Sequence, residues 1–166
     1  MNRNKEKGKA FERAVANHLT EVFGLSFTRT PNSGAYVGGL NAYRMNRLSD
    51  SQILLTEGDI IVPDELHNMK IECKSYKQLA FHQMFTTCKQ LDEWIDQAKS
   101  DDKVWFLIFK INRAGTYICY DNKQYPNFDD VDVNILHYND YIVSTYDEFF
   151  ETNKEILLEL CKKNLT

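Results

Sequence analysis

The stretch Gly58–Tyr76, GDIIVPDELHNMKIECKSY, decides the fold of this chain. It begins with a β-branched run at 59–62, continues through a polar turn at 63–68, and ends in an alternating segment at 69–74. Strand propensity on both sides of turn-forming residues predicts two short strands joined as a hairpin.

The second predicted strand separates its side chains by face. With a period of two residues, Cys73 points to one side while Glu72 and Lys74 point to the other. A hairpin centred within the turn places Asp59 opposite Glu72 or Cys73. Two carboxylates and an ammonium then meet on one patch of sheet, where oxygen ligands suit a divalent cation. A surface ion-pair cluster that contributes little to stability is the competing interpretation.

Length and composition predict one globular domain with a real core. The chain has 166 residues, of which 43% are hydrophobic, 13% aromatic and 27% charged, as is typical of folded proteins. No apolar run approaches the ~20 residues of a membrane span. The N-terminus lacks the apolar region of a secretory signal, so a cytoplasmic location is expected.

Cysteine usage agrees with a reducing compartment. Cys73, Cys88, Cys119 and Cys161 are widely separated and form no CxxC pattern. This spacing argues against a zinc site or a disulfide framework. We expect four small, buried thiols.

Charge is distributed unevenly along the chain. The formal net charge of −4 argues weakly against a nucleic-acid partner. Residues 1–49, however, hold eight Lys and Arg against three acids, whereas residues 121–166 hold four Lys against ten acids. The acidic C-terminal part therefore hides a candidate basic face in the first part of the chain.

Periodicity in the first part of the chain predicts a helix over 5–23, which ends at Gly24. Its apolar stripe consists of Phe11, Ala14, Val15, His18, Leu19 and Val22. A short strand follows over 25–30. A long irregular segment containing Gly, Tyr and Arg then runs to about residue 51, a length that is unusual unless the segment has a function.

The later elements follow the central hairpin. A helix is predicted over 86–100, and a near-continuous apolar strand over 104–111 has both faces covered. A hairpin turn leads to a return strand over 116–120. We also expect an edge strand over 140–143 and a capping box at 145–148, which opens a C-terminal helix. The prediction is a single α/β domain over 1–166, with element order α-β-β-β-α-β-β-α.

Four short patterns occur in order along the chain. They are Gly8-Lys9-Ala10-Phe11-Glu12, Arg29-Thr30-Pro31-Asn32-Ser33-Gly34, Gly58-Asp59-Ile60 and Glu72-Cys73-Lys74. With them the chain resembles the PD-(D/E)XK nuclease superfamily, and within it the archaeal-type and phage-type Holliday junction resolvases, whose patterns are G-x-x-F-E, R-x-x-x-S-G, G-D-I and E-x-K. The resemblance covers about residues 5–111 and leaves 121–166 as a C-terminal extension.

The resemblance implies a restriction-endonuclease-like core, in which a mixed central sheet is flanked by helices. It also implies a metal site: Asp59, Glu72 and the backbone carbonyl of Cys73 would bind one or two Mg²⁺ ions, with Mn²⁺ as a substitute. Glu12 would complete or orient the metal shell from its helix. The simpler interpretation of Glu12 is a solvated helix acid.

Further roles follow from the same resemblance. Lys74 would hold the attacking water or stabilise the charge of the transition state, and Ser33 would help to position the phosphate. Candidates for phosphate contacts outside the site are Lys5, Lys7, Lys9, Arg29, Arg44 and Arg47.

Two nearby acids are excluded from the predicted site. Pro63-Asp64 spells the literal "PD", but the turn places Asp64 near 20 Å from Glu72 at about 3.3 Å per residue. Asp59 is therefore the predicted catalytic acid. Glu57 is a spare ligand at most, and a solvated acid at a strand end is the simpler interpretation.

Four functions compete. The first is a homodimeric, Mg²⁺-dependent, structure-specific DNA endonuclease that resolves four-way junctions, with Ile53, Leu54 and Leu55 as candidate interface residues. The second is a phage or repair nuclease that acts on duplex, flaps or ends; a phage-encoded enzyme would act in the host cytoplasm. The third is a non-cleaving DNA-binding or regulatory protein, and the fourth is a protein-interaction module, favoured by the acidic C-terminal part.

Overall fold

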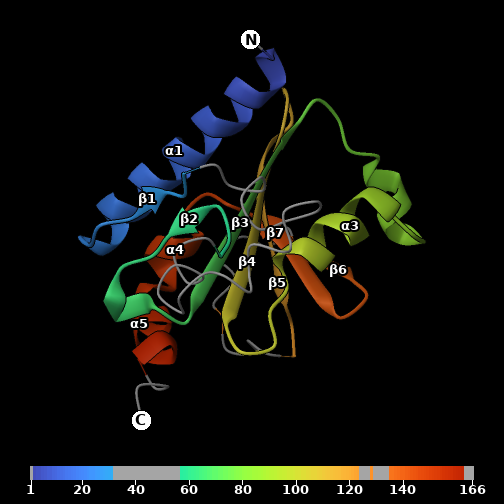
Figure 1. Ribbon diagram of the computed structural model, residues 1–166. Helices are drawn as coiled ribbons and strands as arrows, with labels where there is room; N and C mark the ends of the chain where they lie inside the picture. The colour runs from blue at the N-terminus through green and yellow to red at the C-terminus, as the bar shows by residue number, and fades with distance from the viewer. Residues whose placement is uncertain (1, 32–56, 124–127, 129–134, 163–166) are drawn as a thin grey trace, which may run out of the picture.

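A five-stranded mixed sheet forms the centre of the computed structural model, which describes residues 2–31, 57–123, 128 and 135–162. The strand order is β3-β4-β5-β7-β6 (Figure 1). β3 (Met69–Tyr76) runs parallel to β4 (Val104–Ile111), and the remaining neighbours are antiparallel. This arrangement confirms the predicted fold class.

Helices cover both faces of the sheet, as the apolar sequence of β4 predicts. α1 (Arg3–Phe23) and the C-terminal helices α4 (Phe149–Thr152) and α5 (Lys154–Lys162) pack on one face. α3 (Lys89–Ala98) and the 3₁₀ helix η3 (Phe81–Phe85) pack on the other. In Figure 1, α1 and α3 accordingly lie on opposite sides of the strands.

α1 follows its predicted pattern with one exchange. The helix begins after Asn2, whose side chain accepts a hydrogen bond from the Asn4 amide at 3.2 Å. It ends at Gly24, which has a positive φ of 65°, as expected for a C-terminal cap. The prediction was wrong about Ala14, which is exposed, because Ala16 occupies the buried face instead.

The predicted hairpin at 59–74 was wrong in its pairing. β2 (Ile60–Ile61) pairs antiparallel with β1 (Thr28–Arg29), and not as a ladder with β3. The connection contains the 3₁₀ helix η2 (Asp64–Leu66) in place of a tight turn. β1 is also shorter than the predicted strand over 25–30.

The C-terminal part departs from the predicted element order, because β6 is an additional strand and two helices, α4 and α5, replace the single predicted helix. The strand expected at 140–143 is β7 (Tyr141–Thr145), which lies inside the sheet because β6 (Leu136–Tyr138) pairs along its outer edge. The capping box at 145–148 does not form, since Thr145 is paired with Tyr117 of β5 (Gly115–Asp121). Glu148 precedes α4 with a positive φ of 62° and caps nothing with its side chain.

Candidate active site

Asp59 lies against the edge of β3 that faces away from β4. Its amide donates to the carbonyl of Ile71 at 2.8 Å, and its Oδ2 accepts from the amide of Cys73 at 2.7 Å. The predicted position of Asp59 beside residues 72 and 73 is thereby confirmed, although it is not part of a β-ladder with β3. The carbonyl of Cys73 points to the same edge as its amide, because both groups of one strand residue face the same side.

Gly58 allows this close approach. Its φ is +72°, and a Cβ at this position would lie 2.7 Å from the carbonyl oxygen of Ile71. The left-handed conformation is costly for residues with a Cβ. The glycine of the Gly-Asp-Ile pattern is therefore required by the docking of Asp59 on β3.

Glu72 and Lys74 share the other face of the strand, as the two-residue period predicts. Lys74 Nζ lies 2.9 Å from Glu72 Oε1, and their side chains are only 17% and 15% exposed. Lys74 also donates to Gln97 Oε1 of α3 at 2.5 Å. Two partners therefore hold the ammonium in place.

The role of Gln97 as a partner of Lys74 was not predicted from the sequence. In the sequence, the feature that could have indicated this role is the position of Gln97 three residues after Trp94, at the margin of the apolar stripe of α3. Lys70 Nζ donates to the carbonyl of Gln97 at 3.0 Å and to that of Lys99 at 3.5 Å. A cation at the C-terminal end of a helix is favourable, so β3 and α3 are joined by polar contacts beside the candidate site.

Glu12 is partly buried on α1, with its side chain 13% exposed, and is not a solvated acid. Its Oε2 lies 2.5 Å from Nε of Arg29 in β1. Arg29 was predicted to contact phosphate, but in this structure its guanidinium pairs with Glu12. The pair joins two elements of the site region.

Burial and negative charge act together on the groups of β3. Burial raises the pKa of Glu72, the nearby Asp59 carboxylate raises it further, and Lys74 opposes the rise. Burial likewise raises the pKa of the Cys73 thiol well above its usual value, and Asp59, Glu72 and Glu12 add to this effect. Three carboxylates therefore concentrate negative charge around one strand.

The donor set suits a hard divalent cation. Asp59 and Glu72 supply carboxylate oxygens, the charge of Asp59 raises the pKa of Glu72, and the Cys73 carbonyl adds a neutral oxygen at the edge where Asp59 docks. Oxygen donors of this kind are the ligands that Mg²⁺ uses. In the described part of the chain, no three His, Cys, Asp or Glu side chains are already grouped around one point as metal ligands.

Other predicted site residues lie on α1 or outside the described part of the chain. Lys5 and Lys7 are exposed on α1, and Lys9 lies 3.6 Å from Glu6. Ser33, Arg44 and Arg47 lie outside the described residues, as do the candidate interface residues Ile53, Leu54 and Leu55.

The two excluded acids and the cysteines can also be placed. Asp64 is an exposed residue of η2, which agrees with its assignment to the turn. Glu57 forms an ion pair with Lys103, which is 8% exposed, and is not a free acid at a strand end. All four cysteines are buried free thiols, as predicted. Within the described ranges, no helix is long and apolar enough to cross a bilayer.

A mixed sheet between helices, with an aspartate on the edge of a strand that carries Glu-x-Lys, is the arrangement expected of PD-(D/E)XK nucleases. The chain belongs to the family described as "Phage putative PDDEXK endonuclease", whose model matches residues 3–162. Membership confirms the predicted superfamily and makes the chain a nuclease with DNA as its implied substrate. The match includes the C-terminal strands and helices. No curated protein and no solved structure matched the chain.

Proposed function

We propose that the chain is a Mg²⁺-dependent DNA endonuclease that cuts branched DNA, with the four-way junction as its preferred substrate. The observation that carries the metal-dependent chemistry is the fixed position of Asp59 beside Glu72 and Lys74, in a chain of an endonuclease family. The preference for junctions rests on the resemblance of the four sequence patterns to those of resolvases.

Metal binding and stabilisation of the transition state are assigned to different residues. Asp59, Glu72 and the carbonyl of Cys73 would hold the metal ion, and Mn²⁺ would substitute for Mg²⁺. When bound, the ion supplies an activated water and neutralises charge on the scissile phosphate. Lys74, held by Glu72 and Gln97, orients that water or stabilises the developing negative charge.

Glu12 supports the site from α1. Its carboxylate forms an ion pair with Arg29 in the structure. We propose that Glu12 orients the metal ligands while it is held in this pair. Ser33 is proposed to position the phosphate, as the resemblance implies. Two symmetric nicks require two sites, and a two-fold dimer would supply them.

The test compares the parent protein on a synthetic four-way junction, linear duplex, flap and single strand, with Mg²⁺, Mn²⁺ or chelator. Symmetric nicks near the branch point, absent with chelator, are the expected result. Asp59→Asn and Lys74→Ala should each reduce cleavage by about 10³-fold, because several kcal/mol of transition-state stabilisation are removed. Lys162→Ala, at the end of α5, is the matched control and should cut like the parent.

The other outcomes would each contradict a part of this proposal. Equal cutting of linear duplex would contradict the junction preference and favour a phage or repair nuclease. Tight binding with no cleavage in either metal would favour the non-cleaving DNA-binding protein. Cleavage that survives Asp59→Asn would remove Asp59 from the site and leave the proposed chemistry without its metal ligand.

A further inference from the structure

Three cationic side chains lie at the end of the sheet where β3 and β4 have their C-terminal ends. Lys77 follows β3 directly, while Lys110 and Arg113 belong to the end of β4 and to the β4–β5 turn. The turn is attached to β3, because the amide of Asn112 donates to the carbonyl of Tyr76 at 3.0 Å. We call Lys77, Lys110 and Arg113 the basic rim.

The basic rim is open to solvent. All three side chains are exposed, and none forms an ion pair with a residue that the structure describes. Lys110 interrupts the buried sequence of β4 as its one exposed member. Asp147 and Glu148 follow β7 on the same sheet and are exposed, but neither pairs with the rim.

The backbone of the turn adds a second observation. Arg113 adopts a positive φ of 62°, a conformation that glycine or asparagine adopts with less strain. Strained residues cluster at functional positions. A charged residue is therefore placed at the tip of this turn at the expense of local backbone energy.

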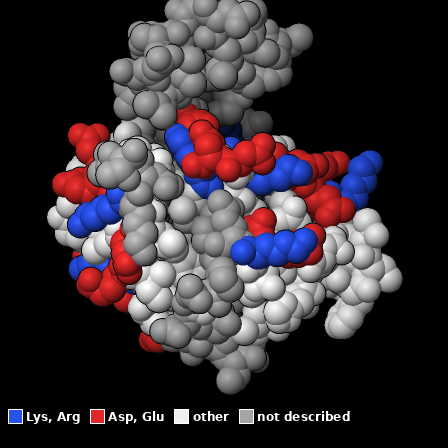
Figure 2. All heavy atoms as spheres, turned by 90° about the horizontal axis from the view of Figure 1, so that it is seen from below, with Lys and Arg blue, Asp and Glu red and all other residues white. Residues whose placement is uncertain are grey.

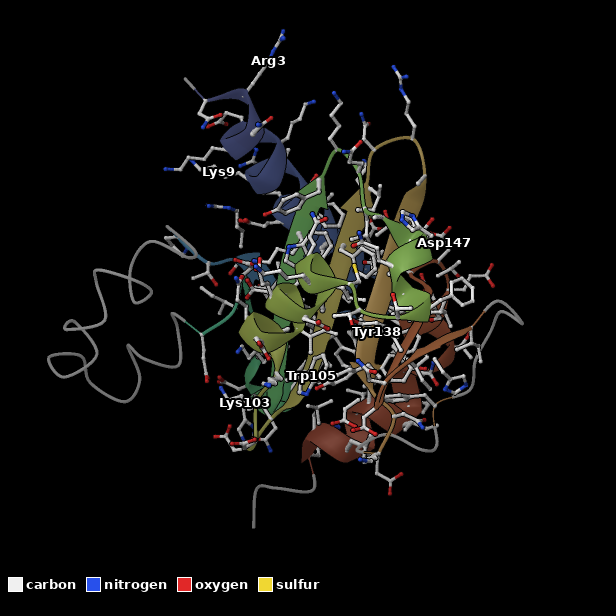
Figure 3. All side chains as sticks on the ribbon, turned by 90° about the vertical axis from the view of Figure 1, so that its right-hand side faces the viewer. Arg3, Lys9, Lys103, Trp105, Tyr138 and Asp147 are labelled. Atoms are coloured by element: carbon white, nitrogen blue, oxygen red, sulfur yellow. The ribbon has the colours of Figure 1, made fainter. Side chains whose placement is uncertain are left out.

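The N-terminal half of α1 lies at the same end of the molecule. Figure 1 places the start of α1 and the β4–β5 turn at the same end of the molecule, and Figure 3 shows Arg3 and Lys9 at that end in a perpendicular view. The opposite end, seen in Figure 2, presents Asp and Glu interspersed with Lys and Arg. The end seen in Figure 2 therefore carries both signs of charge, whereas the three members of the rim are all cations.

We propose that the basic rim binds the phosphate backbone of the DNA arm that extends beyond the scissile phosphate. This inference rests on the proposed function, because it takes DNA as the substrate. Lys77 is three residues after Lys74, which is at most about 10 Å along an extended chain. The rim therefore reaches phosphates of the same duplex arm within a few base pairs of the cut, and the cations of α1 lie at the same end of the molecule.

The experiment measures DNA binding without metal, as a function of salt. The rim variant combines Lys77→Gln, Lys110→Gln and Arg113→Gly, where glycine suits the positive φ and preserves the turn. The matched control combines Lys99→Gln, Lys123→Gln and Lys162→Gln, which remove three charges near the other end of the sheet. Melting curves confirm that both variants fold.

Counterion release sets the expected numbers. Loss of three phosphate contacts should make the negative slope of the log association constant against log salt shallower by about 2 to 3. It should also weaken binding on the order of 10²-fold at about 0.1 M salt. The control should retain the parent slope.

The outcomes separate the rim from the nuclease itself. A rim variant whose slope equals that of the parent would overturn the rim proposal and leave the proposed function standing. Equal weakening in the rim and control variants would also overturn it, because only overall charge would then matter. A parent protein that binds no DNA at any salt would overturn both proposals.

Discussion

β3 is held differently along its two edges. Toward β4, eight residues are in register from Met69 with Val104 to Tyr76 with Ile111. Toward the other edge, two hydrogen bonds attach Asp59, at Ile71 and at Cys73. We call this second contact, formed by Gly58 and Asp59 against those two residues, the docking edge.

The difference separates stability from site geometry. On the face of the sheet that α1, α4 and α5 cover lies an aromatic cluster whose contacting ring centroids are 5.3 to 6.3 Å apart. Its members are Phe106, Tyr120, Phe128, Phe149 and Phe150. Burial of aromatic side chains of this size supplies much of the stability of a core. The docking edge buries little by comparison, but it fixes the position of the candidate metal ligand. Changes in the two regions should therefore have different consequences.

The largest expected effect on stability is in the aromatic cluster. Phe150→Ala should lower the free energy of unfolding by about 4 kcal/mol, because Phe150 is fully buried and contacts Phe106 at a centroid distance of 5.4 Å. Denaturant unfolding measures the loss. Cleavage per folded molecule, assayed well below the unfolding transition, should stay near that of the parent. A large loss of cleavage in fully folded protein would contradict the separation of the two regions.

Gly58→Ala tests the docking edge. The new methyl group would meet the Ile71 carbonyl at 2.7 Å, so Asp59 must shift on β3, and a shift near 1 Å costs about 10²-fold in rate. Single-turnover cleavage of the preferred DNA substrate measures this effect. Gly24→Ala is the matched control, because Gly24 has a similar φ of +65° but open space around its Cβ position.

The control separates backbone strain from displacement of Asp59. Both variants should lose about 1 to 2 kcal/mol of stability from the left-handed conformation of alanine, and Gly58→Ala should lose more because of its contact with the Ile71 carbonyl. Only Gly58→Ala should lose cleavage. Equal cleavage in the two variants would mean that the docking edge does not set the geometry of the site.

The same comparison explains which features could be predicted from the sequence. Local patterns were sufficient for α1, α3, β4 and the alternation of β3, because helix and strand periods are set by the residues themselves. The level of Asp59 beside Cys73 was also predicted. The predicted hairpin over 59–74 was wrong, because Ile60 and Ile61 pair with Thr28 and Arg29, which lie some thirty residues earlier in the chain.

Contacts between distant segments account for the other differences. The position of β7 inside the sheet depends on β6, a three-residue strand whose sequence has little period. The hydrogen bond from Lys74 to Gln97 joins a strand to the helix that follows it, and the Glu12–Arg29 pair joins α1 to β1. Local sequence specifies none of these partners, since each depends on how the elements pack.

A polar bridge between α1 and α4 provides a smaller test. His18 contacts the Tyr146 hydroxyl through Nδ1, and its Nε2 lies 2.7 Å from Glu151 Oε1. Tyr146→Phe removes one partner and should cost about 1 kcal/mol of stability, the usual net contribution of a hydrogen bond.

A double-mutant cycle with Glu151→Gln measures whether the two contacts of His18 act as one network. The expected result is a coupling of at least about 0.5 kcal/mol between Tyr146 and Glu151, with cleavage unchanged in both single variants. Strict additivity would show that His18 serves the two partners independently. Reduced cleavage would place this bridge in support of the docking edge instead of the core.

The smallest expected effect concerns Thr30, which lies beside Asp59. Its amide donates to the carbonyl of Asp59 at 2.9 Å, while its buried hydroxyl has no hydrogen-bond partner among the residues that the structure describes. A buried polar atom without a partner is destabilising. Thr30→Val keeps the shape and should raise stability by up to about 1 kcal/mol, as measured by denaturant unfolding. Because the backbone and not the hydroxyl contacts Asp59, cleavage should be unchanged, and a clear loss of cleavage would instead assign the Thr30 hydroxyl to the substrate.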